Sequence, residues 1–341
     1  MRLACVTGLA GERLTEAEAR FLRDAEPAGL ILFARNVRDV EQMRRLIGDA
    51  RECIGADDAL VLIDQEGGPV QRMGPPVWPK YPAAAALGML FERDQDAGLA
   101  AAHHLACLIA SDLSVVGVNT NCVPVADLPV DGAHDVIGHR AYGRDPEIVV
   151  QLARAVAKAH LACGLVPVVK HVPGHGRAQV DSHDELPIVS EPQEVLAEKD
   201  FRPFRELADL PAMMTAHVVF TDIDDSAPAS TSRGVHDAVI RGEIGFDGLL
   251  FSDDLSMNAL EGPIGGRAAG VIAAGSDLAL HCNGNLAEME AVASAVPELR
   301  GRGAERFLAA CGHVGEATPF DRDEAEHWLG CIREIAEESL N

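Results

Sequence analysis

The sequence contains little lysine, no long apolar run and no closely spaced cysteine pair. Lys and Arg make up 29 of the 341 residues against 53 Asp and Glu, and the lysines are four: Lys80, Lys158, Lys170 and Lys199. A net charge of −24 leaves little basic surface for neutralising phosphates, so we expect no nucleic-acid partner. An anionic membrane surface would repel the same charge, so we expect no membrane partner.

Two further absences concern the location of the protein. No run of about 18 apolar residues occurs, so no transmembrane helix is expected. Residues 1–8 contain one basic residue and a short apolar stretch without a small-residue cleavage pattern, which indicates a first strand and not a signal peptide. The eight cysteines stand singly with no C-x-x-C pair, as is typical of reduced core thiols. We therefore expect a cytoplasmic protein.

What the chain does have is a regular alternation of short apolar runs with helical stretches. A composition of 48% hydrophobic and 24% charged residues is that of a globular protein. The runs that resemble doubly buried strands are residues 3–6, 29–33, 59–63, 116–125, 166–169, 212–215, 248–251 and 278–281. Eight such strands, each followed by a helical segment, predict an α/β fold, a closed (β/α)8 TIM barrel. An open doubly wound sheet is the alternative.

No break in composition indicates a second domain. We expect a single domain over residues 1–341, with the barrel at about 1–285 and a helical C-terminal segment at about 286–341. Thr15 is a good N-cap, and Asp145-Pro146 is a good helix start. Further helices are predicted at residues 192–208 and 231–241.

Ionisable residues follow the strands on one side. In a barrel the carboxyl ends of the strands share one face, where active sites lie. The groups found there are Asp64 and Glu66 after the third strand, Asp127 after the fourth, Lys170 and His171 after the fifth, His217 after the sixth, and Asp253 and Asp254 after the seventh. Lys170 is notable because lysine is scarce. We therefore expect an active site at this face.

No cofactor motif accompanies these residues. His171 and His175 have the spacing of a metal pair, but Pro173 and Gly174 lie between them and prevent the helix that such a pair needs. Neither a G-x-G-x-x-G nor a G-x-x-x-x-G-K-[ST] phosphate loop occurs. We expect neither a metal nor an organic cofactor.

Four short motifs carry a family resemblance. They are Asp64-Gln65-Glu66-Gly67-Gly68, Lys170-His171-Val172-Pro173-Gly174-His175-Gly176, Asp181-Ser182-His183 and Phe251-Ser252-Asp253-Asp254-Leu255-Ser256-Met257. Together they resemble glycoside hydrolase family 3, and specifically its single-domain bacterial β-N-acetylglucosaminidases of cell-wall recycling. The motifs follow the family order over roughly residues 30–285. The resemblance implies a TIM barrel, in agreement with the strand count.

The resemblance also implies catalytic roles. Asp253 falls where the family keeps its nucleophile, which forms a covalent glycosyl-enzyme and retains the anomeric configuration. Its neighbour Asp254 is the competing candidate. His183 falls on the acid/base position, with Asp181 orienting and tuning it. An imidazole with an ordinary pKa near 6.5 can donate and accept a proton near neutral pH, and an adjacent Asp fixes its tautomer. Glu185 is a competing acid on the same loop.

The resemblance places other residues on sugar-binding positions. These are Asp64, Arg72, Arg140, Lys170 and His171, with His217 as a further candidate. Relatives often have an acid directly before the binding arginine, where this chain has His139. The sequence therefore cannot name the partner of Arg140.

The function expected from the resemblance is that of a retaining exo-β-N-acetylglucosaminidase, monomeric and without cofactor. Its substrate would be a muropeptide fragment, GlcNAc linked β-1,4 to 1,6-anhydro-N-acetylmuramic acid, with or without peptide. A glycoside phosphorylase with the same site is one alternative. A second is a metal-dependent, amidohydrolase-like barrel with Lys170, His171, His217 and Asp253 as ligands, although the first strand lacks the H-x-H pair of such sites. A third is a sugar-binding protein without catalysis.

Overall fold

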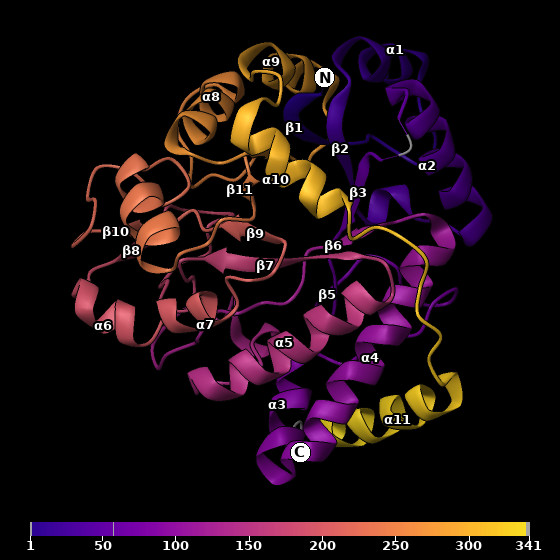
Figure 1. Cartoon of the computed structure of the whole chain (residues 1–341), viewed down its shortest axis with the longest axis vertical. Coiled ribbons are helices and arrows are strands. Elements are labelled where there is room, and N and C mark those ends of the chain that lie inside the picture. Colours follow the sequence, from indigo (N-terminus) through magenta and orange to yellow (C-terminus); the bar gives the residue numbers. More distant parts are fainter. Residues whose placement is uncertain (1, 57, 339–341) are drawn as a thin grey trace.

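Eight parallel strands close into a barrel in the computed structural model, which describes residues 2–56 and 58–338 (Figure 1). The predicted (β/α)8 architecture is thereby confirmed. The order around the barrel is β1-β12-β11-β9-β7-β6-β3-β2, so the last strand pairs with the first. The strands are β1 (Leu3–Gly8), β2 (Pro27–Leu32), β3 (Leu60–Ile63), β6 (Thr120–Asn121), β7 (Val166–Val172), β9 (Ala212–Thr215), β11 (Leu249–Asp254) and β12 (Leu278–His281).

The barrel strands are buried on both faces. Every residue of β2, β3, β7, β9 and β12 is buried, as expected for a parallel sheet covered by helices. In β3 and β9, successive side chains alternate between two apolar clusters. Val168 belongs to the cluster that fills the barrel, whereas Val169 belongs to the cluster beneath the outer helices. This packing fixes the register, so the strands end at defined residues.

The helices surround the barrel (Figure 1). They are α1 (Glu16–Ala25), α2 (Val40–Ile54), α3 (Ala84–Arg93), α4 (Gln95–Val116), α5 (Pro146–Ala162), α6 (Gln193–Glu198), α7 (Phe201–Glu206), the π-helix η3 (Val235–Glu243), α8 (Ile264–Ala274), α9 (Leu286–Ala295), α10 (Gly301–Cys311) and α11 (Arg322–Glu338). The predicted helix starts are confirmed: Thr15 caps α1 and Asp145 caps α5, with a proline in the first turn.

Three predicted elements differ from the structure. The helix expected at 192–208 is two helices, because the ring of Pro203 clashes with the carbonyl of Lys199 four residues earlier. The strand expected at 116–125 shrinks to β6, because α4 runs to Val116 and ends at Gly117 with a φ of 95°. The helix expected at 231–241 is η3, a π-helix that begins at Val235.

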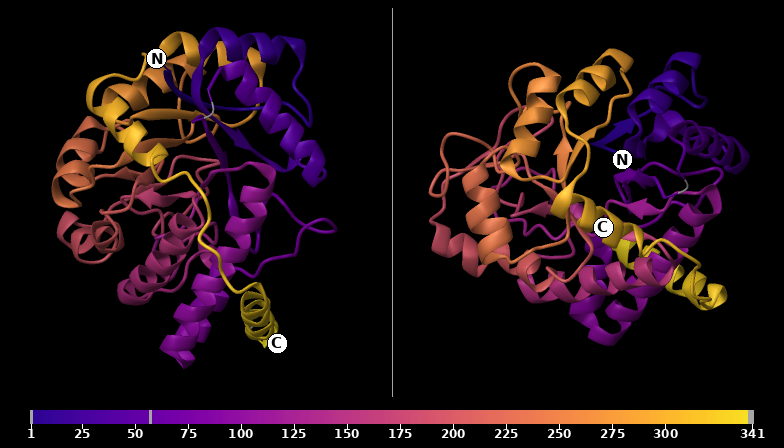
Figure 2. Two further views of the ribbon diagram at one scale, coloured as in Figure 1. Left: turned by 45° about the vertical axis from the view of Figure 1, so that its right-hand side comes forward. Right: turned by 45° about the horizontal axis from the view of Figure 1, so that its top comes forward.

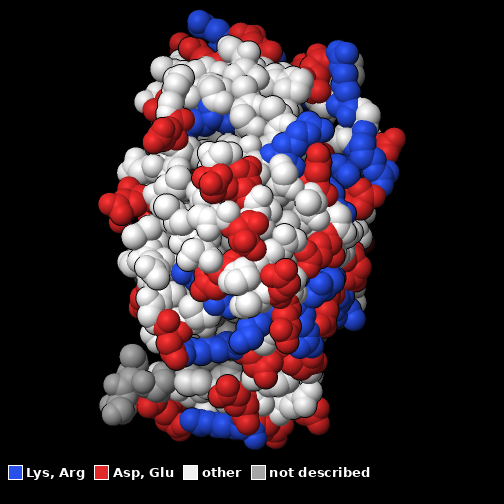
Figure 3. Space-filling view, turned by 90° about the vertical axis from the view of Figure 1, so that its left-hand side faces the viewer, with Lys and Arg blue, Asp and Glu red and all other residues white. Residues whose placement is uncertain are grey.

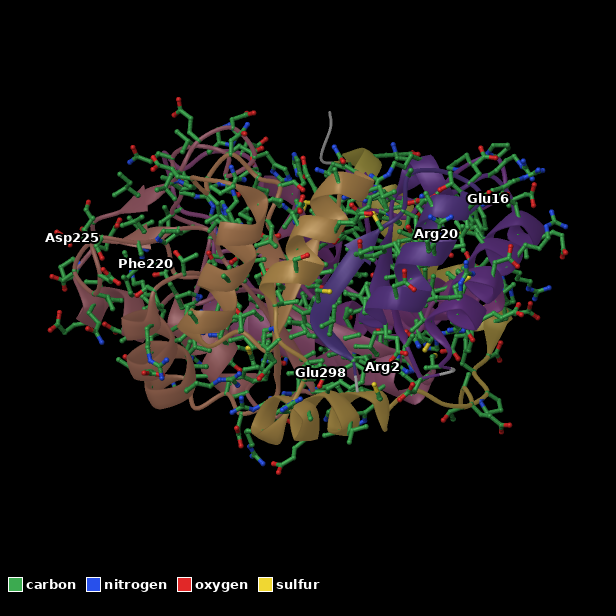
Figure 4. The ribbon with its side chains drawn as sticks, turned by 90° about the horizontal axis from the view of Figure 1, so that it is seen from above. Arg2, Glu16, Arg20, Phe220, Asp225 and Glu298 are labelled. Carbon is green, nitrogen blue, oxygen red and sulfur yellow. The ribbon has the colours of Figure 1, made fainter. Side chains whose placement is uncertain are left out.

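The N-terminal end of the barrel is closed by the chain that follows α9. Ala4 donates a backbone hydrogen bond to the Pro297 carbonyl, and Leu299 donates one to Arg2, both at 2.8 Å. Figure 4 shows α10 crossing this end, with Arg2 and Glu298 beside it. Phe307 of α10 is buried in the apolar cluster that also contains residues of β1 and β12. A binding site is therefore left to the opposite end, at the carboxyl ends of the strands.

The C-terminal helix α11 lies on the outside, reached by an extended segment after α10 (Figure 2). It packs against α3 and α4, and α5 packs on α4 from another side. Among the described helices, α4 has the length and composition that would allow it to cross a membrane, and 56% of its most apolar window is buried here. The apolar character of α4 therefore matches its position among these helices.

The acidic excess does not form one patch on the face shown in Figure 3. Acidic and basic side chains are interspersed there and separated by uncharged surface.

Two small sheets complete the rim of the barrel: β4 (Gln65–Gly67) with β5 (Val70–Gln71), and β8 (Ile188–Val189) with β10 (Val219–Phe220). The assignment of the whole chain to a single domain remains a prediction.

The capping box at Thr15 provides a test of the fold. The Thr15 hydroxyl accepts from the Glu18 amide at 3.1 Å, and the Glu18 carboxylate accepts from the Thr15 amide at 2.9 Å. We expect Thr15→Ala to lower the free energy of unfolding by about 1 kcal/mol, measured by urea denaturation. Thr15→Ser keeps the hydroxyl and should match the wild type. An equal loss in both variants would contradict the capping argument.

Candidate active site

A narrow cleft opens at the carboxyl ends of the barrel strands. It brings together seven of the predicted site residues: Asp64, Arg72, Arg140, Lys170, His171, His183 and Asp253. Apolar walls from Ile31, Phe33, Val136, Ile137 and Met257 complete it. The residues come from strands that are far apart in the sequence, so the barrel closure creates the site.

The floor of the cleft is a cluster of buried charges around Lys170. The Lys170 Nζ lies 2.8 Å from Asp64 Oδ1 and 2.6 Å from Glu66 Oε1. Arg140 donates from Nε and Nη2 to the two oxygens of Glu66, both at 2.9 Å, in a bidentate pair. Arg72 donates to Asp64 Oδ2 at 3.1 Å. Glu66 is therefore the partner of Arg140 that the sequence could not name.

These ion pairs keep every member of the cluster charged. Burial alone would raise the pKa of Asp64, but Lys170 and Arg72 outweigh it and hold that pKa well below its usual range. The pKa of Glu66 is lowered against burial in the same way by Lys170 and Arg140. Burial would lower the pKa of Lys170, yet the two carboxylates raise it. The result is a fixed set of charged donors and acceptors facing the cleft.

The two adjacent acids at the end of β11 have different environments. Asp253 lines the cleft, and its Oδ1 accepts from the backbone amide of Asp254 at 2.8 Å. Burial opposes its ionisation, but His171, His217 and that amide keep the pKa of Asp253 below its usual value. Asp254 Oδ1 accepts from the amides of Ser256 and Cys282 at 3.0 and 3.1 Å. Asp254 also lines the cleft, but its carboxylate is tied to the backbone of two loops.

A second buried carboxylate, Asp127, organises the histidines after β7. Its Oδ2 lies 2.7 Å from the Nδ1 of His171, and its Oδ1 accepts from the backbone amide of His175 at 2.7 Å. The pair orients the His171 ring towards the cleft, because an acceptor on one ring nitrogen fixes the tautomer. Burial lowers the pKa of His175 to about 4, so that ring is neutral near pH 7.

The predicted Asp181–His183 pair is formed on an exposed loop. Asp181 Oδ1 lies 2.7 Å from His183 Nδ1 and also accepts from the His183 amide at 2.9 Å. The His183 side chain is 66% exposed, whereas that of Asp181 is 23% exposed. Despite burial, the bonds to His183 lower the pKa of Asp181. The carboxylate is therefore ionised and holds the imidazole by one nitrogen.

His217 has a different position from the other predicted residues. Its Nδ1 lies 2.6 Å from the hydroxyl of Ser230, and its Nε2 lies 3.0 Å from the carbonyl of Asp254. It is fully buried and is not among the residues that line the cleft. The His217 ring therefore links the segment between β10 and η3 to the end of β11.

Three functional residues were not predicted as site members. Glu66 stands inside the first family motif, two residues after Asp64, so the motif itself held the signal. Asp127 follows the fourth strand and was recognised only as part of the rim. His175 was considered as a metal ligand with His171. The sequence could not show that Asp127 joins these two histidines, because it lies more than 40 residues away from both.

Two of the residues that would bind the metal in the amidohydrolase-like alternative have other partners in this structure. Lys170 is paired with two carboxylates, and both nitrogens of His217 have partners within the protein. Among residues 2–56 and 58–338, no group of three or more His, Cys, Asp and Glu side chains is placed to hold a metal ion.

Removal of the Glu66 charge tests whether the buried ion pairs around Lys170 stabilise the fold. Because Glu66→Gln leaves Lys170 and Arg140 with less counter-charge in a buried place, we expect the free energy of unfolding to fall by about 3 kcal/mol at pH 7. Urea denaturation measures it. Glu305→Gln, in an exposed pair with Arg302, is the control and should match the wild type. If the two variants are equally stable, the cluster does not stabilise the fold.

The pH dependence of the same variant tests the direction of the pKa change. A carboxylate whose folded pKa is depressed stabilises the protein fully above its unfolded-state pKa, about 4.3 for Glu. That stabilisation is lost as the pH falls from there towards the lower folded-state pKa. The stability difference between wild type and Glu66→Gln should therefore be constant above about pH 5 and shrink below about pH 4. A difference that grows on acidification would contradict the assignment.

Comparisons with known proteins agree with this geometry. Residues 2–314 match the glycosyl hydrolase family 3 N-terminal domain. The β-hexosaminidase of Alkalilimnicola ehrlichii is 41% identical over 280 residues, which are 81% of this chain and 79% of that protein. The β-hexosaminidase of Methylococcus capsulatus is 38% identical over 339 residues, 96% of this chain and 97% of that protein.

Solved structures give the same result. NagZ of Neisseria gonorrhoeae, in complex with N-trifluoroacetyl-D-glucosamine, superposes with a TM-score of 0.84 at 30% identity, covering 98% of each chain. A family 3 β-N-acetylglucosaminidase of Paenibacillus sp. superposes with a TM-score of 0.86 at 29% identity, covering 98% of this chain and 67% of that one. The family predicted from the four motifs is confirmed: the chain belongs to glycosyl hydrolase family 3, beside relatives named β-hexosaminidase.

Proposed function

We propose that the protein is a retaining exo-β-N-acetylglucosaminidase that removes terminal β-1,4-linked GlcNAc from muropeptide fragments. One observation carries the proposal: a single cleft holds an ionised strand-end carboxylate, Asp253, and the exposed imidazole of an Asp–His pair, His183. A nucleophile and a separate proton donor are the two groups that a retaining glycosidase needs. We also propose that the protein is cytoplasmic and monomeric.

Asp253 is the nucleophile in this proposal. One of its oxygens is held by the Asp254 amide, which leaves the other to attack the anomeric carbon. The C1–O bond to the leaving group breaks as the carboxylate–C1 bond forms. The lowered pKa of Asp253 keeps it ionised for this step. Asp254 remains the competing nucleophile because it lines the same cleft; it differs in that two backbone amides bind its Oδ1 and fix it to the loops after β11 and β12.

His183 is the proton donor and then the proton acceptor. Its Nδ1 faces Asp181, so Nε2 remains to protonate the leaving oxygen. In the second step the same nitrogen removes a proton from the water that attacks C1, and the glycosyl-enzyme is hydrolysed with net retention. A histidine can do both near neutral pH without burial, which agrees with its exposed position.

The charged residues at the floor of the cleft are suited to bind the hydroxyl groups of a sugar. Ionised Asp64 and the cations Arg72 and Lys170 offer acceptors and donors to sugar hydroxyls. The gonococcal relative holds an N-acylated glucosamine, which supports an N-acetylhexosamine in this cleft. A peptide-bearing aglycone is itself carboxylated, so the net charge of −24 should slow its approach and local cations such as Arg72 must bind it.

A phosphorylase with the same residues is the competing reaction. An exposed histidine repels a phosphate anion less than a carboxylate acid/base would, which favours this alternative. Product analysis with and without phosphate decides between them. Free GlcNAc at an unchanged rate supports hydrolysis, whereas phosphate-dependent release of the sugar 1-phosphate would replace it.

Substitution of the nucleophile provides the main test. Asp253→Ala should lower kcat on the disaccharide by at least about 10⁴-fold, because no covalent intermediate forms, while sugar binding measured by calorimetry persists. Asp254→Asn is the matched control and should retain far more activity, provided that it folds. Wild-type-like turnover in Asp253→Ala would reject the assignment.

The acid/base role predicts a dependence on the leaving group. His183→Ala should reduce kcat/KM by about 10²–10⁴-fold for the disaccharide, whose leaving alcohol needs a proton. The loss should be small for a dinitrophenyl glycoside, whose leaving group departs as an anion. Glu185→Gln, on the same loop, is the control and should behave like the wild type. The same loss on both substrates would show that His183 does not donate the proton.

A further inference from the structure

Ser182 is the one buried residue in an otherwise exposed part of the described chain. From Gln179 to Leu186 the residues are exposed or half-buried, except that Ser182 is 2% exposed. It stands between Asp181 and His183. The loop that carries the proposed acid/base therefore contacts the protein interior through this residue.

The hydrogen bonds between this loop and the rest of the described chain also involve Ser182. The Ser182 hydroxyl lies 3.0 Å from the Nε2 of His175, and the Ser182 carbonyl accepts from the Ala259 amide at 3.2 Å. The other hydrogen bonds recorded for residues 179–186 are internal, from the Asp184 and Glu185 amides and from His183 to Asp181. Ser182 thus makes both of the recorded hydrogen bonds that tie this segment to the rest of the described chain.

The partners of Ser182 are themselves fixed. His175 is buried, and its backbone amide donates to Asp127, the carboxylate that also holds His171. Ala259 follows β11, the strand that carries Asp253 and ends at Asp254. The Ser182 side chain therefore bonds the loop to the histidines on the proposed sugar-binding side of the cleft. The Ser182 carbonyl bonds the loop to the segment after β11, the strand that carries the proposed nucleophile.

We propose that Ser182 is a positioning residue for proton transfer. Its hydroxyl, bound to His175, holds the Asp181–His183 pair where the imidazole reaches the leaving oxygen. Without this bond a single recorded hydrogen bond ties residues 179–186 to the rest of the described chain between the two fixed ends of the loop, and the exposed imidazole samples orientations outside the cleft. Proton transfer needs hydrogen-bond reach, so small displacements cost large factors in rate. The inference rests on the proposed role of His183.

Ser182→Ala tests the inference through the leaving-group dependence of kcat/KM. We expect a loss of about 10–100-fold on the disaccharide and of less than about 3-fold on the dinitrophenyl glycoside, because only the former needs a positioned proton. Ser190→Ala, at an exposed serine beside β8, is the control and should match the wild type on both. Equal losses on the two substrates, or none, would overturn the proposal.

Two further variants keep the outcome clear. The double variant Ser182→Ala/His183→Ala should be no slower than His183→Ala alone, because Ser182 acts through His183; additive losses would contradict this.

If Ser182→Ala fails to fold, His175→Leu removes the same bond from the other side and should show the same leaving-group dependence. A steep dependence in His183→Ala with none in Ser182→Ala overturns this inference alone. No dependence in His183→Ala overturns the proposed function as well.

Discussion

Lys170 holds a positive charge in the floor of the cleft with only 2% of its surface exposed, and the rest of the site depends on how that charge is balanced. Asp64 and Glu66 balance it from β3 and the hairpin after it, and Glu66 in turn binds Arg140 from a loop after β6. A buried charge without such partners would be strongly destabilising, so the cluster joins three parts of the barrel rim. Three of the charges that hold the rim together, Lys170, Asp64 and Arg140, also line the cleft.

The two proposed catalytic groups stand on supports of different kinds. Asp253 extends a barrel strand whose preceding residues are fully buried, so its position is set by the core. His183 stands on a loop that reaches the protein interior through Ser182. This division explains why the loop needs a specific anchor and the nucleophile does not.

Much of the fold was predictable because strand burial leaves a direct signal in the sequence. Continuous apolar runs marked seven of the eight barrel strands, whereas the fourth run far exceeded the short polar strand β6; the Thr15 and Asp145 caps marked helix starts. The break at Lys199 was missed because Pro203 acts four residues upstream of its own position. In the site, the motifs pointed to the residues that face the cleft. The buried links, Glu66 to Arg140 and Asp127 to His171, depend on contacts between distant segments that no local pattern contains.

In the proposed reaction Asp253 forms a covalent bond to the sugar during turnover, and trapping that glycosyl-enzyme is the decisive experiment. A 5-fluorinated N-acetylglucosaminyl fluoride slows both steps, but its good leaving group keeps formation of the intermediate faster than its breakdown. Mass spectrometry of the protein should show the addition of one fluorinated sugar, and peptide mapping should locate it on Asp253. A label on Asp254, or turnover of the fluoride to an inverted product without any labelled protein, would contradict the account.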